Sequence, residues 1–341
     1  MEIIEPLLKE LALPFRVSPL GQSFKKKSIY KVSIGSGAIK VLMWSQMHGN
    51  ETTGTKALFD LFKFLSSNDT IAKQILKACT LVFIPMLNPD GAAAYTRVNA
   101  QGIDLNRDAI ALEAEESRLL RKTLQQEQPE YCFNLHDQRI IFSIGDKNLP
   151  ASISFLAPSI DKERTLTSGR KMTMAVIAAM YNVLKNHLPN QIGRYTDEFY
   201  PTATGDNFEK AGHHTILIEA GHFKDDYDRE VVRKLNFIAL LSGITYIANT
   251  SEFNNFKTYF TIPNNEKKYL DLIYKNIILS EENKMIDVGV MYKEVLVDQK
   301  IIFTPEIKYI TDLSAYNANQ IIDKKGELFK NKEALLRLFD K

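Results

Sequence analysis

A histidine and a glutamate lie three residues apart in the stretch 43–54, MWSQMHGNETTG, as His48 and Glu51. This spacing brings an imidazole and a carboxylate to one side of a turn, close enough to bind one metal ion. Zinc accepts this pair, and in catalytic sites it takes a third protein ligand and leaves one position for water. Because the short motif also occurs by chance as a solvated histidine near a surface glutamate, it needs support from the rest of the chain.

The pair lies where a predicted strand passes into a predicted helix. Residues 39–47 form a near-continuous apolar run, which is typical of a buried strand. In residues 51–65 the apolar positions recur at helical spacing, which predicts an amphipathic helix. This junction is the usual place for a ligand site in an open α/β sheet.

Two further residues end apolar runs that read as strands. His136 closes residues 131–138, and Glu219 closes residues 214–221. Each could be a structural residue when it is considered alone, although a carboxylate at the end of a buried run is costly unless it is paired or functional. Two histidines and one glutamate would make an open zinc site, which leaves Glu219 free to act as a base.

A larger set of residues resembles the zinc carboxypeptidase family typified by carboxypeptidase A. Their order and approximate spacing match across residues 40–222, and the compact part between 97 and 107 has no disulfide loop, as in members that act on bacterial cell-wall peptides. The matching residues are His48-Gly49-Asn50-Glu51, Asn88-Pro89-Asp90-Gly91, Arg97, Gly102-Ile103-Asp104-Leu105-Asn106-Arg107, Leu135-His136 and Glu219.

The resemblance implies a zinc-dependent hydrolase with one Zn²⁺ per chain, held by His48, Glu51 and His136. Asp104 would orient the ring of His48 through its second nitrogen. Glu219 would act as the catalytic base that takes a proton from water and returns it to the leaving amine.

The resemblance also implies which residues bind the substrate. Arg97 would stabilise the oxyanion as a second catalytic residue. Asn106 and Arg107 would bind the terminal carboxylate, for which a guanidinium group is well suited. Without the resemblance, both arginines would be interpreted as surface residues.

This chain departs from the family pattern at several positions. Asp-Gln follows His136, where the digestive enzymes have a small residue and a tyrosine. The mobile tyrosine of the family could correspond to Tyr200 or Tyr195, and we expect Tyr200 to contact substrate. Asp206, near the expected floor of the specificity pocket, could select a cationic group, or it could be a turn residue beside Gly205.

The chain as a whole predicts an α/β fold with a mixed, mostly parallel sheet covered by helices on both faces. Residues 28–34 and 39–47 are expected to form a hairpin, because a Gly-Ser-Gly turn separates them. We expect residues 1–250 to form the catalytic domain and residues 251–341 a small β-rich accessory domain. Within the latter, a short helix is predicted near 266–278.

Composition restricts the remaining classes. The chain has 341 residues, 45% hydrophobic and 25% charged, and a net charge of +2, which gives no electrostatic case for nucleic acid or an anionic membrane as the main partner. We expect no membrane span, no secretory signal and a cytoplasmic location. Cys79 and Cys132 are predicted to pack as small core residues, so the metal would not be bound by thiolates.

Three functions remain compatible with these residues. The preferred one is a metallocarboxypeptidase acting on short or cell-wall-derived peptides. The alternative is an N-acyl amino acid deacylase resembling the aspartoacylase and succinylglutamate desuccinylase enzymes, which share HGNE, DLNR and a β-rich C-terminal domain. The third is a metal-free binding protein on the same fold. The expected partner is a peptide or an acylated amino acid with a free carboxylate, and the sequence is compatible with a homo-oligomer.

Overall fold

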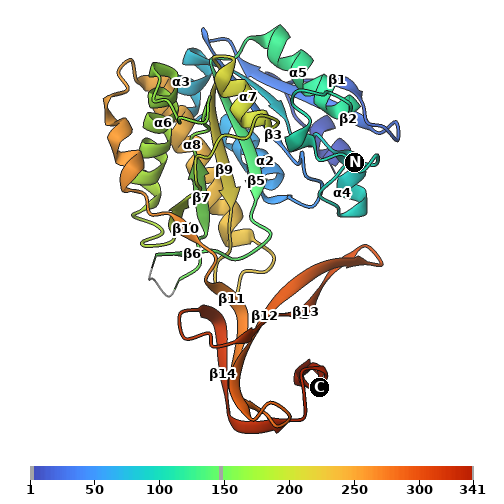
Figure 1. Cartoon of the computed structure of the whole chain (residues 1–341). Helices are drawn as coiled ribbons and strands as arrows, with labels where there is room; N and C mark the ends of the chain where they lie inside the picture. Colours follow the sequence, from blue (N-terminus) through green and yellow to red (C-terminus); the bar gives the residue numbers. More distant parts are fainter. Residues whose placement is uncertain (1–3, 146–148, 340–341) are drawn as a thin grey trace.

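The computed structural model describes residues 4–145 and 149–339. Its centre is an eight-stranded sheet with the order β1-β2-β4-β3-β5-β9-β7-β8 (Figure 1). Neighbouring strands are parallel from β4 through β3 and β5 to β9, and antiparallel where β2 joins β4 and β7 joins β9. The strands are β1 Arg16–Gln22, β2 Ser28–Gly35, β3 Ile39–Ser45, β4 Cys79–Ile84, β5 Tyr131–Asp137, β7 Ile153–Leu156, β8 Ile192–Arg194 and β9 His214–Ala220.

Helices cover both faces of this sheet, which confirms the predicted α/β class. The α-helices are α1 Ile4–Lys9, α2 Thr53–Leu65, α3 Thr70–Ala78, α4 Pro89–Ala94, α5 Glu115–Glu127, α6 Ser168–Leu184, α7 Thr204–Lys210 and α8 Glu230–Asn249. Short 3-10 helices are η1 Leu105–Arg107, η2 Asn254–Thr261 and η3 Glu333–Phe339.

Strand β3 shows why its sequence is a continuous apolar run. Val41 and Met43 join the core that α2, α6 and α8 cover, whereas Leu42 and Trp44 join the core on the opposite face, with α5 and α7. Since successive side chains of a strand point to opposite faces, a strand buried on both sides must be apolar at every position. This burial fixes the end of β3, and therefore His48, in the middle of the sheet.

The predicted hairpin of residues 28–47 is wrong. Strand β4 lies between β2 and β3 and pairs with both, antiparallel to β2 and parallel to β3. The turn at Gly35 does reverse the chain, with φ of +90°. The crossover through α2 and α3 then brings β4 into the gap, where its apolar residues are buried on both sides. A short connection suggests pairing but does not require it.

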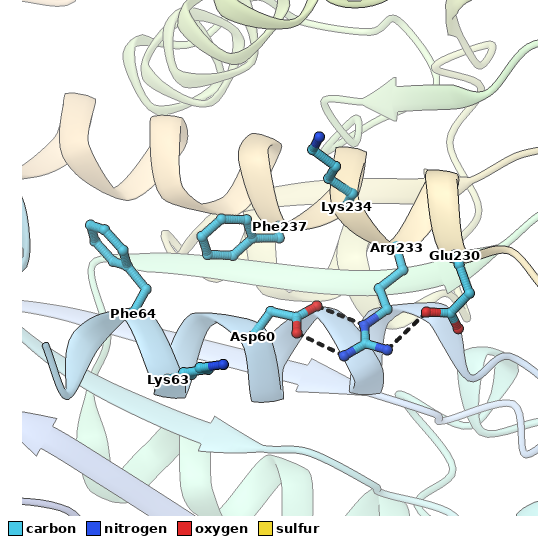
Figure 2. Close-up of a pocket in the computed structure, with 7 residues that line it drawn as sticks. All are labelled: Asp60, Lys63, Phe64, Glu230, Arg233, Lys234 and Phe237. Atoms are coloured by element: carbon cyan, nitrogen blue, oxygen red, sulfur yellow. Dashed lines mark hydrogen bonds and ion pairs between the residues drawn. The ribbon is translucent and has the colours of Figure 1, made fainter.

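Helix α8 is long and apolar enough to cross a bilayer by length and composition alone. In this structure it packs against α2, α3 and α6. Arg233 binds Asp60 of α2 through two hydrogen bonds of 2.7 Å and also contacts Glu230 (Figure 2). A cavity of about 520 Å³ lies along this α2–α8 contact, lined also by Lys63, Phe64, Lys234 and Phe237.

The C-terminal part forms a separate four-stranded sheet with the order β13-β12-β11-β14 (Figure 1). Its strands are β11 Tyr269–Leu279, β12 Lys284–Val297, β13 Lys300–Thr311 and β14 Asn317–Phe329, and a two-stranded pair joins β6 Ser143–Ile144 to β10 Asn265–Glu266. The helix predicted near 266–278 is therefore wrong: β11 is a central strand between β12 and β14. Its dense apolar sequence is compatible with either element, and pairing on both edges decides for the strand.

The segment between the two sheets belongs structurally to the first. Tyr259 and Ile262 are buried in the core of the large sheet, and η2 packs on α6. The second sheet begins at Tyr269. The division of the chain into domains at residue 250 stays a prediction.

Candidate metal centre and active site

Three side chains that are distant in the sequence converge at the carboxyl ends of β3 and β5. His48, Glu51 and His136 each offer a ligand atom, and these atoms lie within 4.8 Å of one another. The Glu51 carboxylate bridges the two rings: Oε1 lies 2.8 Å from Nδ1 of His48, and Oε2 lies 2.9 Å from Nδ1 of His136. All three residues are buried. This arrangement could hold one metal ion with two nitrogens and a carboxylate.

The turn that carries His48 rests directly on helix α4. A Cβ at Gly49 would lie 1.9 Å from the backbone of Gly91, so this close approach requires glycine. Asn88 fixes the contact, because its Nδ2 donates to Met47 O at 3.2 Å while its Oδ1 accepts from Gly91 N at 2.8 Å. The Asn-Pro-Asp-Gly segment, residues 88–91, therefore packs against the turn that carries His48 and holds it in place.

Glu51 and helix α2 are held by the residue after His136. The backbone N–H of Asp137 donates to Oε2 of Glu51 at 3.1 Å. The Asp137 carboxylate in turn accepts from the backbone N and the hydroxyl of Thr53 at 3.1 and 2.8 Å. It thereby satisfies a free N–H in the first turn of α2. The Asp that departs from the digestive enzymes thus has a positioning role here.

The donor set fits a zinc ion. Asp104 Oδ1 lies 3.0 Å from Nε2 of His48, and since a carboxylate only accepts, this nitrogen carries the proton. Nδ1 of His48, which lies 2.8 Å from Oε1 of Glu51 and 3.3 Å from Nη1 of Arg97, is then the nitrogen available to a metal ion. The two Nδ1 atoms are 3.2 Å apart. Nitrogens bound tetrahedrally to zinc at ~2.0–2.1 Å are separated by about 3.3 Å.

Asp104 also connects the metal group to Arg97. Its Oδ2 accepts from Arg97 Nε at 3.0 Å, and Arg97 Nη1 lies 3.6 Å from Glu51. Partial burial opposes ionisation of Asp104, but hydrogen bonds with His48 and Arg97 hold its pKa well below the ordinary value. The Arg97 side chain is 45% exposed, so it remains accessible to a substrate beside the metal group.

Glu219 lies on the strand next to His136. The two residues are paired in the parallel β5–β9 ladder, so their side chains point to the same face of the sheet. Burial raises the pKa of Glu219 well above its ordinary value, and the charges of Glu51 and Asp137 add to the shift. No hydrogen bond restrains its carboxylate among the described residues, which leaves it available to a reacting group.

The structure gathers the predicted substrate-binding residues around the loop before α7. Asn106 Oδ1 accepts from Thr204 N at 3.1 Å, which ties η1 to α7. The exposed guanidinium group of Arg107 lies over the ring of Tyr200, 5.2 Å from its centroid. Asp206 is buried, and its Oδ1 accepts from the backbone N of Tyr200 at 3.1 Å. Asp206 therefore makes the turn-forming contact that was one of its two predicted roles.

Tyr195 lies close to the metal group. Burial raises the pKa of Tyr195, and the nearby charges of Glu219 and Glu51 raise it further. The ring of Tyr195 packs against Phe142, with centroids 5.3 Å apart, while Tyr200 lies against Arg107.

Sequence reasoning missed the contact between the second sheet and this site. Arg139, two residues past β5, donates to Asn50 O at 3.0 Å. The same guanidinium group binds Glu294 of β12, which also accepts from the Tyr95 hydroxyl. The second sheet thus contacts the metal-binding turn through one arginine. Nothing in the local sequence around Arg139 or Glu294 indicates this pairing.

The match to a known protein family covers the part of the chain that contains His48 and Glu51 and ends before His136 and Glu219. Residues 7–130 match the family model described as zinc carboxypeptidase. Carboxypeptidase 2 of Trichophyton tonsurans is 30% identical over 115 residues, which cover 34% of this chain and 21% of that protein. The chain therefore aligns with only about a fifth of the length of this curated relative.

Solved structures show the same fold at low sequence identity. A metallo-carboxypeptidase from Burkholderia cenocepacia superposes with a TM-score of 0.57 at 17% identity, covering 72% of this chain and 67% of that one. Carboxypeptidase A from Helicoverpa armigera gives a TM-score of 0.54 at 16% identity, covering 72% and 71%. Residues 7–130 are therefore similar to the zinc carboxypeptidase family, and most of the chain shares the fold of solved metallo-carboxypeptidases.

Proposed function

We propose that the protein is a zinc-dependent metallocarboxypeptidase that cleaves an amide bond next to a free carboxylate, on short or cell-wall-derived peptides. The observation that carries this proposal is the convergence of His48, Glu51 and His136 within 4.8 Å, with Glu219 paired to His136 on the adjacent strand. A scaffold used only for binding would have no physical need for this buried donor set beside an unrestrained carboxylate.

The residues divide the work of hydrolysis among them. His48, Glu51 and His136 would hold zinc, which when bound polarises the scissile carbonyl and activates water. Glu219 accepts the proton of the attacking water and passes it to the leaving nitrogen. Arg97, whose Nη1 lies 3.3 Å from Nδ1 of His48, would stabilise the carbonyl oxygen that becomes negative.

Arg107 and Asn106 would bind the free carboxylate of the substrate. Arg107 is exposed, and its guanidinium group stacks on the ring of Tyr200. This stacking orients the group and uses none of its N–H donors. Nη1 donates to Asn106 O at 2.7 Å, while the described contacts of Arg107 include no acidic side chain. A planar guanidinium group can then take a carboxylate through two parallel hydrogen bonds.

N-acyl amino acid deacylation remains the second candidate, because the β-rich C-terminal sheet contacts the metal-binding turn through Glu294 and Arg139. A sheet that borders the site in this way would limit the space for substrate, which would suit a small acylated amino acid. Parallel assays with blocked dipeptides and N-acetyl amino acids separate the two activities. Faster hydrolysis of the N-acetyl compounds would contradict the peptidase proposal.

A comparison of two enzymes and two substrates tests the exopeptidase proposal. The wild type should cleave a peptide with a free C-terminal carboxylate and reject its C-terminal amide. Arg107→Ala should lose roughly thirty- to a thousandfold in kcat/KM on the acid and treat both substrates nearly alike. Arg107→Lys should recover only part of the loss, because an ammonium group cannot offer two parallel donors. Equal cleavage of acid and amide by the wild type would contradict the proposal.

A further inference from the structure

A cavity of about 600 Å³ opens beside the predicted active site. It is bordered by the segment after β5, the segment around and after β8, and the residues that lead into β11. Phe142 and Tyr195 form an aromatic part of its wall, with their ring centroids 5.3 Å apart. None of the residues proposed above to hold zinc or bind the free carboxylate lines this cavity.

Strand register places this cavity next to the catalytic row. His136 pairs with Glu219, Glu219 pairs with Ser154 of β7, and Ser154 pairs with Gly193 of β8. These four residues therefore form one line across neighbouring strands, each step about 4.8 Å. Arg194 follows Gly193 in β8, so its side chain points to the opposite face of the sheet, where it lies over Tyr259 at the border of the cavity. The line reaches the cavity through Ser154, which is the neighbour of Glu219 and donates to the cavity residue Asn265.

The wall nearest to Glu219 is built from a hydrogen-bonded chain. Gln138 Nε2 donates to Ser154 Oγ at 2.8 Å, and Ser154 Oγ donates to Asn265 Oδ1 at 3.0 Å. Asn265 occupies the space where a Cβ of Gly193 would be, because that atom would lie 1.9 Å from its Oδ1. Asn265 is therefore held in the cavity by its contacts with β7 and β8, and β7 is the direct neighbour of the strand that carries Glu219.

Positively charged side chains outnumber acidic ones in the cavity wall. Arg164, Arg194 and Lys267 line it, with Asp197 as its acidic residue. Asp197 already binds Arg164 at 3.3 Å and the buried Arg170. The described contacts of Arg194 are with the rings of Tyr259 and Phe260, at 5.1 and 5.9 Å, and include no carboxylate. Lys267 is exposed, and no ion pair is found for it in the described part of the chain.

Two buried donors in this cavity have no hydrogen-bond partner. Nε of Arg194 and Nδ2 of Asn265 are both removed from solvent and unpaired among the described residues. An unsatisfied buried donor is costly, so such groups suggest a ligand that supplies acceptors. Donors and cations together favour a carboxylate over a neutral or cationic group.

We propose that this cavity binds a carboxylate-bearing side chain of the substrate, so that the enzyme prefers an acidic residue at or next to the cleaved bond. This inference rests on the proposed carboxypeptidase function and gives it a substrate class. It differs from selection of a cation by Asp206, whose Oδ1 is engaged with the Tyr200 backbone. Arg194 and Lys267 would neutralise the side-chain carboxylate, and Asn265 would donate to it.

Matched peptides that differ in one group test the preference. Blocked peptides with Glu, Gln, Leu or Lys as the last residue, or as the residue before it, are compared by kcat/KM. The wild type should favour Glu over Gln by roughly ten- to a hundredfold at one of these positions. Lys267→Glu and Arg194→Met should remove that preference, because they should lower kcat/KM for the Glu peptide much more than for the Gln peptide. A wild type without a Glu preference, or variants that keep it, would overturn the inference.

The control is Lys234→Glu, which makes the same charge change at an exposed lysine of the α2–α8 cavity (Figure 2). It should retain the wild-type preference. Lys267 is exposed as well, so its variant should fold even if Arg194→Met does not.

A binding measurement separates this inference from the proposed activity. Calorimetry with N-acetyl-glutamate and N-acetyl-glutamine on zinc-loaded protein should show tighter binding of the glutamate compound by the wild type and Lys234→Glu. Lys267→Glu should bind both compounds equally. This result would support the cavity assignment even if no peptide were cleaved. Cleavage of Gln and Leu peptides without any discrimination in binding would refute the cavity assignment while the carboxypeptidase proposal stands.

Discussion

Glu219 stands beside His136 on the adjacent parallel strand, as its partner in the β5–β9 register. Because residues paired in this way project from the same face, a proposed ligand and a proposed base share one side of the sheet. The pairing is set by the backbone of two buried strands, so neither residue depends on a flexible loop for its position. This rigidity makes separate tests of metal binding and proton transfer feasible.

Glu219→Gln should separate catalysis from metal binding. The amide preserves the shape of the side chain but cannot accept the proton, so turnover should fall on the order of a hundredfold or more. Zinc content should stay at one ion per chain, because Glu219 is not among the proposed ligands. Steady-state kinetics and metal analysis on the same preparation measure both. Near-normal turnover with any good substrate would contradict the assignment.

His136→Ala should remove most of the zinc affinity. Two protein ligands, His48 and Glu51, would remain, too few for a stable zinc site. Zinc per chain after dialysis against a weak chelator is the measurement. His187→Ala at an exposed histidine is the matched control and should keep its zinc. A His136 variant that retains stoichiometric zinc would show that the metal group is misassigned.

Asp104→Ala should weaken zinc binding without removing a ligand. The carboxylate holds Nε2 of His48 at 3.0 Å and thereby directs Nδ1 toward Glu51. Loss of such a partner typically lowers metal affinity by about ten- to a hundredfold. Competition with a chromophoric chelator gives the affinity, and Asp104→Asn should show a smaller loss because it can still accept from Nε2. Unchanged affinity in Asp104→Ala would rule out this positioning role.

Glu209 should make stability depend on pH. Burial raises its pKa from 4.5 to about 7, although Thr215 and Thr173 donate to its Oε2. The folded state therefore holds this proton up to a higher pH than the unfolded state. Its stabilising contribution is present below pH 4.5 and is lost as pH rises through 7.

The matched variant is Glu209→Gln, which cannot titrate. Between pH 5 and pH 8 the wild type should lose roughly 2–3 kcal/mol of unfolding free energy relative to the variant. Urea denaturation at a series of pH values measures this difference on zinc-loaded protein. Parallel pH profiles for the two proteins would mean that Glu209 does not retain its proton in the folded state.

The sequence by itself determined the elements of the site and most of the large sheet. The strand before His48 could be predicted because burial on both faces requires a continuous apolar run. The helix after Glu51 could be predicted because burial on one face places apolar residues at helical spacing. His136 and Glu219 were found for a similar reason, since each ends an apolar run. Cys79 and Cys132 are free and buried, as their apolar surroundings predict.

Only the tertiary structure decided how these elements pair. The insertion of β4 between β2 and β3 depends on hydrogen bonds between residues about fifty positions apart, and local pattern carries no information on them. The same limit explains why residues 266–278 were predicted as a helix. Strand β11 pairs with β14, whose residues lie about fifty positions later in the chain.

The tertiary structure also decided which charged residues meet. Arg139 and Glu294 are 155 positions apart, and their contact depends on where the second sheet lies. Arg194 and Lys267 face one cavity because β8 and the segment before β11 end at the same edge. From the sequence each would be interpreted as an ordinary surface cation. Whether such a residue can bind a ligand depends on the charged groups that folding places beside it.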